Sequence, residues 1–138
     1  AVPEPMLAKI RSIFGTGWAD EDQVREMIAD CWNKNHYVID PHTACGYYVM
    51  QQMPRDPLTP RVLLSTASPY KFGASVLGAV AGQKACDGLD DFACCRALAE
   101  LTGTREPAQI LALPDLPIRH TAVCEKDKMA QAVLDAVK

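Results

Sequence analysis

Prolines restrict where regular secondary structure can form in this chain of 138 residues. Pro54, Pro57 and Pro60 lie within seven positions, and each fixes its own φ angle and lacks a backbone N–H donor. Residues 54–60 are therefore predicted to form a connecting loop rather than a helix or a strand. Residues 104–117 also hold three prolines and are predicted to be irregular. Regular elements are expected before, between and after these two regions.

The composition is typical of one soluble globular domain that spans residues 1–138. Hydrophobic residues make up 49% of the chain and charged residues 22%, and a chain of this length buries roughly 68% of its unfolded surface. The net charge of -3 lacks the basic excess that contacts with nucleic-acid phosphates require, so we expect no nucleic-acid partner. The longest apolar run, Phe72 to Gly82, is too short to cross a membrane, and no membrane partner is expected.

The six cysteines are interpreted as reduced thiols of a cytoplasmic protein that pack as small apolar side chains. The sequence has no CxxC pair and its three histidines lie far apart, so no metal site is predicted. The first residues, Ala1 to Pro5, lack the basic and apolar regions of a signal peptide. Since no initiator Met precedes them, we expect the chain to begin at a processing or excision boundary.

Two helices are predicted before the proline-rich loop. Asp20 and Gln23 have the spacing of a capping box, and apolar residues recur at helical spacing after them, which predicts an amphipathic helix over 20–34. The dipeptide Asp40-Pro41 is typical of an N-cap followed by the first helical position. A second helix is therefore predicted from this dipeptide to the start of the loop.

Three more helices are predicted after the loop. Residues 69–80 are expected to be helical with Ser68 as the N-cap, because a proline favours the first helical position. A helix over 89–101 has Gly103 just past its end, where glycine commonly terminates helices. A last amphipathic helix is predicted to begin at about Lys126.

Two segments are interpreted as strands. Residues 61–66 contain the continuous apolar run Val62-Leu63-Leu64 and are assigned to a central strand, and residues 118–124 are assigned to a short one. Strands interleaved with helices predict an α/β fold, with helices around a small, mostly parallel sheet. Because two strands are too few for an independent sheet, the sequence also indicates that part of the protein is missing.

Three hydroxyl side chains, Ser65, Thr66 and Ser68, follow the predicted central strand. In open α/β sheets, ligands bind at this end of the strands, beside helix N-termini. The same hydroxyls could instead satisfy the backbone of the turn and cap the next helix. The residue types alone leave both interpretations open.

Two linked motifs resemble those of the longer-chain bacterial and fungal threonine synthases. The segment Asp40-Pro41-His42-Thr43-Ala44-Cys45-Gly46 resembles the pattern DPHTAxG, and Thr66-Ala67-Ser68-Pro69-Tyr70-Lys71-Phe72 resembles TASPxKF. The order and the spacing of the motifs also match. The resemblance is good over about residues 13–72 and weak over the remainder.

The resemblance implies the C-terminal part of a pyridoxal-phosphate enzyme with the tryptophan-synthase-β-like fold. Such an enzyme converts O-phospho-L-homoserine and water to L-threonine and phosphate, in threonine biosynthesis. In the family a threonine hydroxyl hydrogen-bonds the pyridine nitrogen of the cofactor, and the matching position is Thr66. A neutral hydroxyl can donate to an unprotonated ring nitrogen, whereas a carboxylate would hold the ring as a pyridinium. Thr66 is the one cofactor-binding residue predicted.

The sequence departs from a complete enzyme of this family. The family's covalent lysine, its glycine-rich loop for the cofactor phosphate and its ligands for the substrate phosphate lie upstream of the matching region. Lys71 does not match that lysine, and no catalytic residue is assigned. We therefore expect the isolated chain to be inactive and to lack bound pyridoxal phosphate. It should expose apolar surface that the missing N-terminal part would cover, or that self-association would hide.

His42 falls in the first turn of a predicted helix, where the helix dipole disfavours its protonated form. It either bonds to the neighbouring backbone or contacts the active site, and the sequence leaves both open. Two alternatives for function also remain. One is another enzyme of the same cofactor fold, such as a serine or threonine dehydratase, and the other is a binding or scaffolding domain without catalysis.

Overall fold

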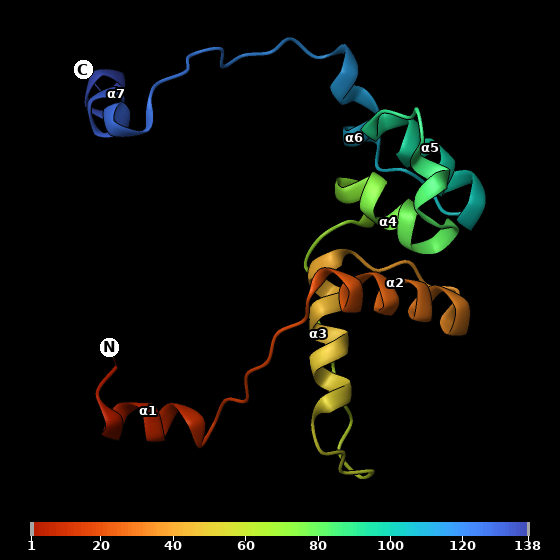
Figure 1. Cartoon of the computed structure of the whole chain (residues 1–138), viewed down its shortest axis with the longest axis vertical. Helices are drawn as coiled ribbons and strands as arrows, with labels where there is room; N and C mark the ends of the chain where they lie inside the picture. The colour runs from red at the N-terminus through yellow and green to blue at the C-terminus, as the bar shows by residue number, and fades with distance from the viewer. Residues whose placement is uncertain (1, 138) are drawn as a thin grey trace.

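The computed structural model describes residues 2–137, and every regular element within them is a helix (Figure 1). The α-helices are α1 (Glu4–Arg11), α2 (Glu21–Asn35), α3 (Pro41–Gln52), α4 (Gly73–Ala81), α5 (Asp91–Thr102), α6 (Ala108–Ala112) and α7 (Met129–Ala136). Short 3-10 turns are η1 (Pro69–Phe72), η2 (Gln83–Cys86), η3 (Leu113–Asp115) and η4 (Lys126–Lys128).

The predicted α/β fold around a mostly parallel sheet is wrong for these residues, because the described chain contains no strand. Segments 61–66 and 118–124 are neither helical nor paired. Val62 is 80% exposed and Val123 is 95% exposed, so neither run is buried. A strand requires a neighbouring strand to accept and donate its backbone hydrogen bonds. The apolar run in the sequence indicates a segment that is suited to burial, but it does not supply that neighbour.

The starts of α2, α3 and α5 follow from capping residues and confirm the predictions. The helix predicted over 69–80 instead begins as the 3-10 turn η1, and residues 104–117, predicted to be irregular, contain α6 and η3. Asp20 and Gln23 form the reciprocal capping box of α2, with bonds of 2.8 and 2.9 Å between side chain and backbone. The Asp90 carboxylate accepts from the backbone of Ala93 at the start of α5. The same helix ends at Gly103, which has a φ of 64° that glycine adopts without strain.

The core lies among α2, α3, α4 and α5, which pack together on one side of the molecule (Figure 1). α4 contacts both α2 and α5, so it lies at the centre of this group. The largest apolar side chains that are almost completely buried come from α2, α4 and α5, and they are Ile28, Val76, Leu77, Cys94 and Leu98. This helical core holds the two motifs next to each other.

Helices α1 and α7 lie away from the core, each at the end of an irregular segment (Figure 1). Both keep apolar residues exposed, among them Phe14 just after α1 and Val133 in α7, each 63% exposed. α7 begins close to the predicted position, whereas α1 was not predicted from the sequence. None of the helices within residues 2–137 is long and apolar enough to cross a membrane.

Candidate functional site

The first motif begins with a buried carboxylate at the N-terminus of α3. Asp40 is 0% exposed, and its Oδ1 accepts from the backbone N–H groups of His42 at 2.9 Å and Thr43 at 3.3 Å. Its Oδ2 accepts from the hydroxyl of Thr43, which is also buried. Pro41 occupies the first helical position, where a backbone N–H would have no acceptor within the helix, so its missing N–H costs no hydrogen bond. The predicted N-cap is therefore confirmed, and a side-chain bond from Thr43 is added to it.

The hydrogen bonds around Asp40 favour its ionised form. Burial by itself would raise the pKa of the carboxyl, because it removes water from the charge. The bonds from the Thr43 hydroxyl and from the backbone of Thr43 and His42 outweigh that effect, so the pKa of Asp40 lies below its ordinary value. Asp40 is thus a fixed negative charge at the positive end of α3.

His42 places its backbone and its imidazole in different surroundings. The backbone N–H donates to the Asp40 carboxylate, which is a side chain and not neighbouring backbone. The imidazole is 66% exposed, and its Nδ1 lies 3.4 Å from Oδ1 of Asp40. The ring packs against Phe72 with 5.1 Å between the ring centroids, which brings the first motif into contact with the second.

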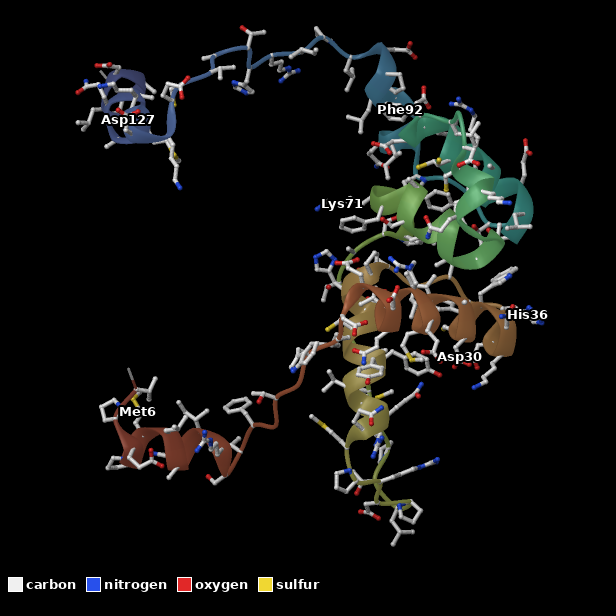
Figure 2. All side chains as sticks on the ribbon, viewed as in Figure 1. Met6, Asp30, His36, Lys71, Phe92 and Asp127 are labelled. Atoms are coloured by element: carbon white, nitrogen blue, oxygen red, sulfur yellow. The ribbon has the colours of Figure 1, made fainter. Side chains whose placement is uncertain are left out.

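Lys71 contacts the same aromatic residue. Its Nζ is 5.7 Å from the centroid of the Phe72 ring, within the range of a cation–π contact. Figure 2 shows the side chain extending away from the helices. The lysine therefore contacts an aromatic ring next to the second motif.

The predicted cofactor residue, Thr66, lies in the segment that leads into η1. Its side chain is exposed, and among residues 2–137 its hydroxyl has no hydrogen-bond partner. The preceding residue, Ser65, has its Oγ 3.5 Å from Oγ1 of Thr43. Ser68 accepts from the backbone N–H of Tyr70 at 3.3 Å, so its predicted capping role is confirmed. Of the three hydroxyls, only that of Thr66 remains unpaired.

A hydrogen-bond chain fixes the end of the second motif to α5. The buried Tyr70 hydroxyl bonds to Thr104, and Thr104 bonds to Thr102 at 2.8 Å. The Thr102 hydroxyl in turn donates to the carbonyl of Leu98. Thr104 was not predicted as part of the site. Residues 104–117 were predicted to be irregular, and no local pattern indicates that Thr104 bonds to Tyr70, 34 positions earlier in the chain.

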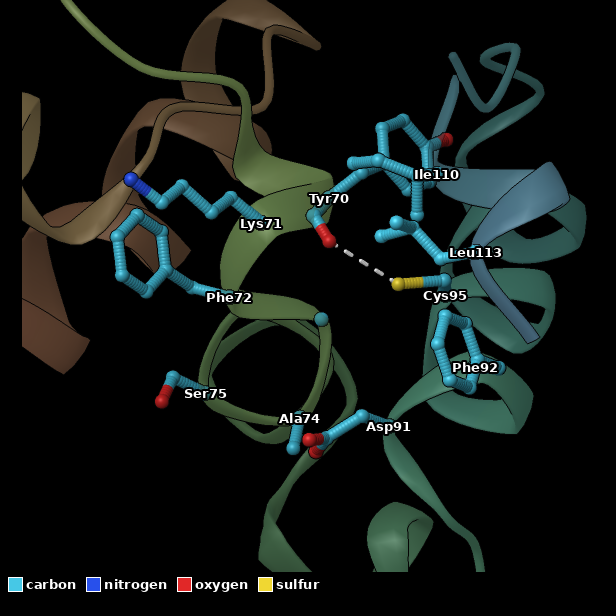
Figure 3. Close-up of a pocket in the computed structure, with 11 residues that line it drawn as sticks. Tyr70, Lys71, Phe72, Ala74, Ser75, Asp91, Phe92, Cys95, Ile110 and Leu113 are labelled. Atoms are coloured by element: carbon cyan, nitrogen blue, oxygen red, sulfur yellow. Dashed lines mark hydrogen bonds between the residues drawn. The ribbon is translucent and has the colours of Figure 1, made fainter. Parts of the chain in front are cut away.

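A cavity of about 420 Å³ opens beside the second motif, between η1, α5 and α6 (Figure 3). Phe92, Ile110 and Leu113 form its apolar wall, and Cys95 donates to the Tyr70 carbonyl at 3.1 Å. Lys71 and Phe72 lie on the opposite side of it. The sequence did not predict this cavity, because its walls come from five separate elements, η1, α4, α5, α6 and η3.

No metal centre is present within the described residues, since no group of three or more His, Cys, Asp or Glu side chains has a suitable arrangement. All six cysteines are free thiols. The site therefore consists of hydroxyls, one buried carboxylate and a few exposed basic or aromatic side chains. Such an arrangement can orient a bound group and donate hydrogen bonds to it.

Comparisons with known proteins identify the family. The family model described as "Threonine synthase, C-terminal" matches residues 43–134, about two thirds of the chain. Threonine synthase of Corynebacterium glutamicum is 40% identical over 67 residues, which are 49% of this chain and 14% of that protein. Threonine synthase of Pseudomonas aeruginosa is 31% identical over 83 residues, or 60% of this chain and 18% of that one.

A vertebrate relative shows the same partial coverage. Threonine synthase-like 2 of Xenopus laevis is 35% identical over 72 residues, which are 51% of this chain and 15% of that protein. The matched region is thus less than a fifth of the length of each of these three relatives. Since the family model matches well over half of the sequence and includes most of both motifs, the chain belongs to the threonine synthase C-terminal family.

Proposed function

We propose that this chain is the C-terminal part of a threonine synthase and forms one wall of its pyridoxal-phosphate site. The complete enzyme would be a cytoplasmic lyase that converts O-phospho-L-homoserine and water to L-threonine and phosphate. The family match over residues 43–134 supports the identity of the enzyme. The unpaired hydroxyl of Thr66, within that match, is the observation that supports the role of this chain.

The residues present fit one side of the cofactor. An exposed hydroxyl without a protein partner is free to donate to the pyridine nitrogen, and it adds no charge to the ring. Bound pyridoxal phosphate would supply the electron sink for the chemistry. Thr66 would bind and orient the ring, while Ser65 and Ser68 are already engaged with Thr43 and Tyr70.

This chain is expected to be inactive by itself. In this proposal Lys71 has no covalent role, since its Nζ lies over the Phe72 ring and it does not match the covalent lysine of the family. The covalent lysine and the phosphate ligands would come from the remaining part of the enzyme. The exposed apolar side chains of Val62 and Leu64, next to Thr66, are suited to contact that part.

A chimeric enzyme tests the proposal. Residues 40–137 of this chain would replace the corresponding segment of the Corynebacterium glutamicum threonine synthase, and the product would be tested for growth rescue of a threonine auxotroph. We expect rescue by the chimera and by its Thr66→Ser variant, which keeps the hydroxyl. Thr66→Val should lower the rate of threonine formation from O-phospho-L-homoserine by about tenfold or more, because it removes a bond made to the reacting cofactor.

A matched control separates the hydroxyl from general effects of the substitution. Thr121 is exposed and has no hydrogen-bond partner among the described residues, and it too lies within the family match. Thr121→Val should leave the chimera as active as before. Equal activity of the Thr66→Val and Thr121→Val chimeras, or a chimera that never forms threonine, would contradict the proposal.

A further inference from the structure

Segment 61–66 lies along α3 through every second residue. The Arg61 guanidinium donates to the carbonyls of Met50 at 2.6 Å, Met53 at 2.9 Å and Pro54 at 2.7 Å. Leu63 packs so closely on Gly46 that a Cβ atom there would lie 3.0 Å from Cδ1 of the leucine.

The third contact is between Ser65 and Thr43, whose hydroxyl oxygens are 3.5 Å apart. The residues touched on α3 thus move from its C-terminal end to its first turn as the segment advances. Figure 1 shows the chain returning along α3 after the loop. The lengths also agree, since four residues of extended chain span roughly 13 Å and seven residues of helix about 10 Å.

The residues between these contacts face away from α3. Side chains alternate between the two sides of an extended segment, and the contacts with α3 follow that alternation, since Arg61, Leu63 and Ser65 make them. Arg61 and Ser65 are nevertheless exposed, and Leu63 alone of residues 61–66 is partly buried. Leu63 is partly buried, whereas Val62 is 80% exposed and Leu64 is 74% exposed. Thr66 has the same parity as these two exposed residues, and its side chain is exposed.

We propose that α3 sets the register of segment 61–66, and that Thr43 and Gly46 of the first motif are positioning residues for Thr66 of the second. This inference rests on the proposed function for the role of Thr66, but the register itself does not. A shift of the segment by one residue would turn Thr66 toward the helix and Ser65 away from it. The two motifs therefore act together, because the first fixes the direction of the Thr66 hydroxyl in the second.

The two positioning residues act by different means. Thr43 is buried and held by its bond to Asp40, so its hydroxyl is a fixed point beside which Ser65 lies. Gly46 provides a gap for the Leu63 side chain, and a larger residue there would occupy the space that this leucine fills. Asp40 supports both, because it caps the helix that carries them.

Engineered disulfides in the full chain test the register without any cofactor. The double variant Thr43→Cys with Ser65→Cys brings two thiols to positions whose native oxygens are 3.5 Å apart. It should form a disulfide under mild oxidation roughly tenfold faster than Thr43→Cys with Thr66→Cys, whose second thiol faces away. Peptide masses would identify the linked pair among the native cysteines. Equal rates, or a faster link to position 66, would overturn the inference.

The glycine provides a second test of the same register. Gly46→Val should slow the link between positions 43 and 65, and adding Leu63→Ala should restore its rate, because the shorter side chain frees the space that the valine requires. If the segment is held by something other than this contact, Leu63→Ala will not restore the rate, and the role of Gly46 is refuted.

The chimeric enzyme connects the register to Thr66. Thr43→Val should lower kcat roughly tenfold with little change in KM and should alter the absorbance of the bound cofactor, whereas Thr43→Ser should retain both. If Thr43 has only a structural role, the two variants will change in stability while the absorbance of the bound cofactor stays the same. That result would refute the positioning role of Thr43. If the disulfides confirm the register while Thr66→Val has no effect, the register stands and the proposed function fails.

Discussion

Gly73 at the start of α4 approaches Cys95 of α5 so closely that a Cβ atom on the glycine would lie 2.5 Å from the cysteine Sγ. The same atom would lie 3.2 Å from the carbonyl oxygen of Asp91, which belongs to the backbone and cannot turn aside. We therefore expect Gly73→Ala to destabilise the protein by about 1–3 kcal/mol, the usual cost of overpacking. Urea unfolding monitored by circular dichroism would measure the change.

Gly78 of the same helix is the matched control for this substitution. It is also buried, but a Cβ there would meet only the flexible end of Gln83, at 3.0 Å. Gly78→Ala should be neutral or stabilising, since alanine is favoured over glycine in a helix by up to about 1 kcal/mol. If both variants lose the same stability, the close packing of α4 on α5 is not the cause.

Features that depend on neighbouring residues could be predicted from the sequence, whereas features that depend on distant residues could not. The ends of α2, α3 and α5 were predictable because the capping residues lie within three or four positions of the groups they satisfy. The prediction of a strand over 61–66 was wrong, because a strand must pair with a second strand and no local pattern specifies one. In this chain the segment contacts α3 instead.

The candidate site divides in the same way. The cap at Asp40 was predicted and is confirmed, and the cofactor role of Thr66 stays a prediction. The contacts that join the two motifs could not be derived from either motif alone. The pair between Thr43 and Ser65 spans 22 positions, and the bond between Tyr70 and Thr104 spans 34. These long-range contacts appear only after the helices have packed.

The charge of Asp40 should make stability depend on pH. Its pKa is lowered in the folded state, below the value of about 3.9 for an unfolded chain. Its ionised form therefore stabilises the fold above that value, and the contribution is lost as the pH falls through the lower, folded pKa. Asp40→Asn should cost about 1 kcal/mol at pH near 7, because the amide nitrogen that replaces Oδ2 cannot accept from the Thr43 hydroxyl.

Urea unfolding of both proteins across the acid range checks this prediction. The difference in unfolding free energy between wild type and Asp40→Asn should shrink as the pH falls below about 4. Asp56 also has a lowered pKa, from its bonds with Thr59 and Leu58, but it is present in both proteins and cancels in the difference. A difference that stays constant with pH would rule out the charge of Asp40 as its source.

Arg61 should hold the proline-rich loop against the end of α3. Its guanidinium bonds to three backbone carbonyls, which a lysine ammonium on a flexible stem cannot reproduce in the same geometry. Arg61→Lys should therefore speed chymotryptic cleavage after Leu58, which is 92% exposed in the loop. Arg55→Lys, in the same loop, is the control and should leave the cleavage rate unchanged, since the Arg55 side chain makes no hydrogen bond or ion pair with residues 2–137.

The cysteines should differ strongly in reactivity. Burial raises the pKa of the Cys31, Cys94 and Cys95 thiols, so at neutral pH these remain protonated and covered. Cys124 is exposed, and it should react first with a disulfide reagent such as dithionitrobenzoate. Loss of the fast phase in Cys124→Ser, with release of the slow thiols in urea, is the expected result. The half-buried Cys45 and Cys86 should react more slowly than Cys124 and faster than the three buried thiols. A fast phase that survives the substitution and is assigned by peptide mass to Cys31, Cys94 or Cys95 would contradict the burial of those thiols.

The isolated chain should not form a specific covalent bond with pyridoxal phosphate. One hydroxyl contact contributes about 1 kcal/mol, which is less than the cost of immobilising the cofactor on a protein surface. Titration of the chain with pyridoxal phosphate should therefore give no saturable absorbance band of an imine between a lysine and the cofactor. Borohydride reduction should leave only weak labelling spread over the exposed lysines, and Lys71→Arg should lower the total by no more than the share of one exposed lysine. A single lysine that is labelled to saturation, identified by peptide mass, would instead indicate that this chain binds the cofactor without the remaining part of the enzyme. In that case this chain would contribute more to the cofactor site than the single wall assigned to it in the proposal.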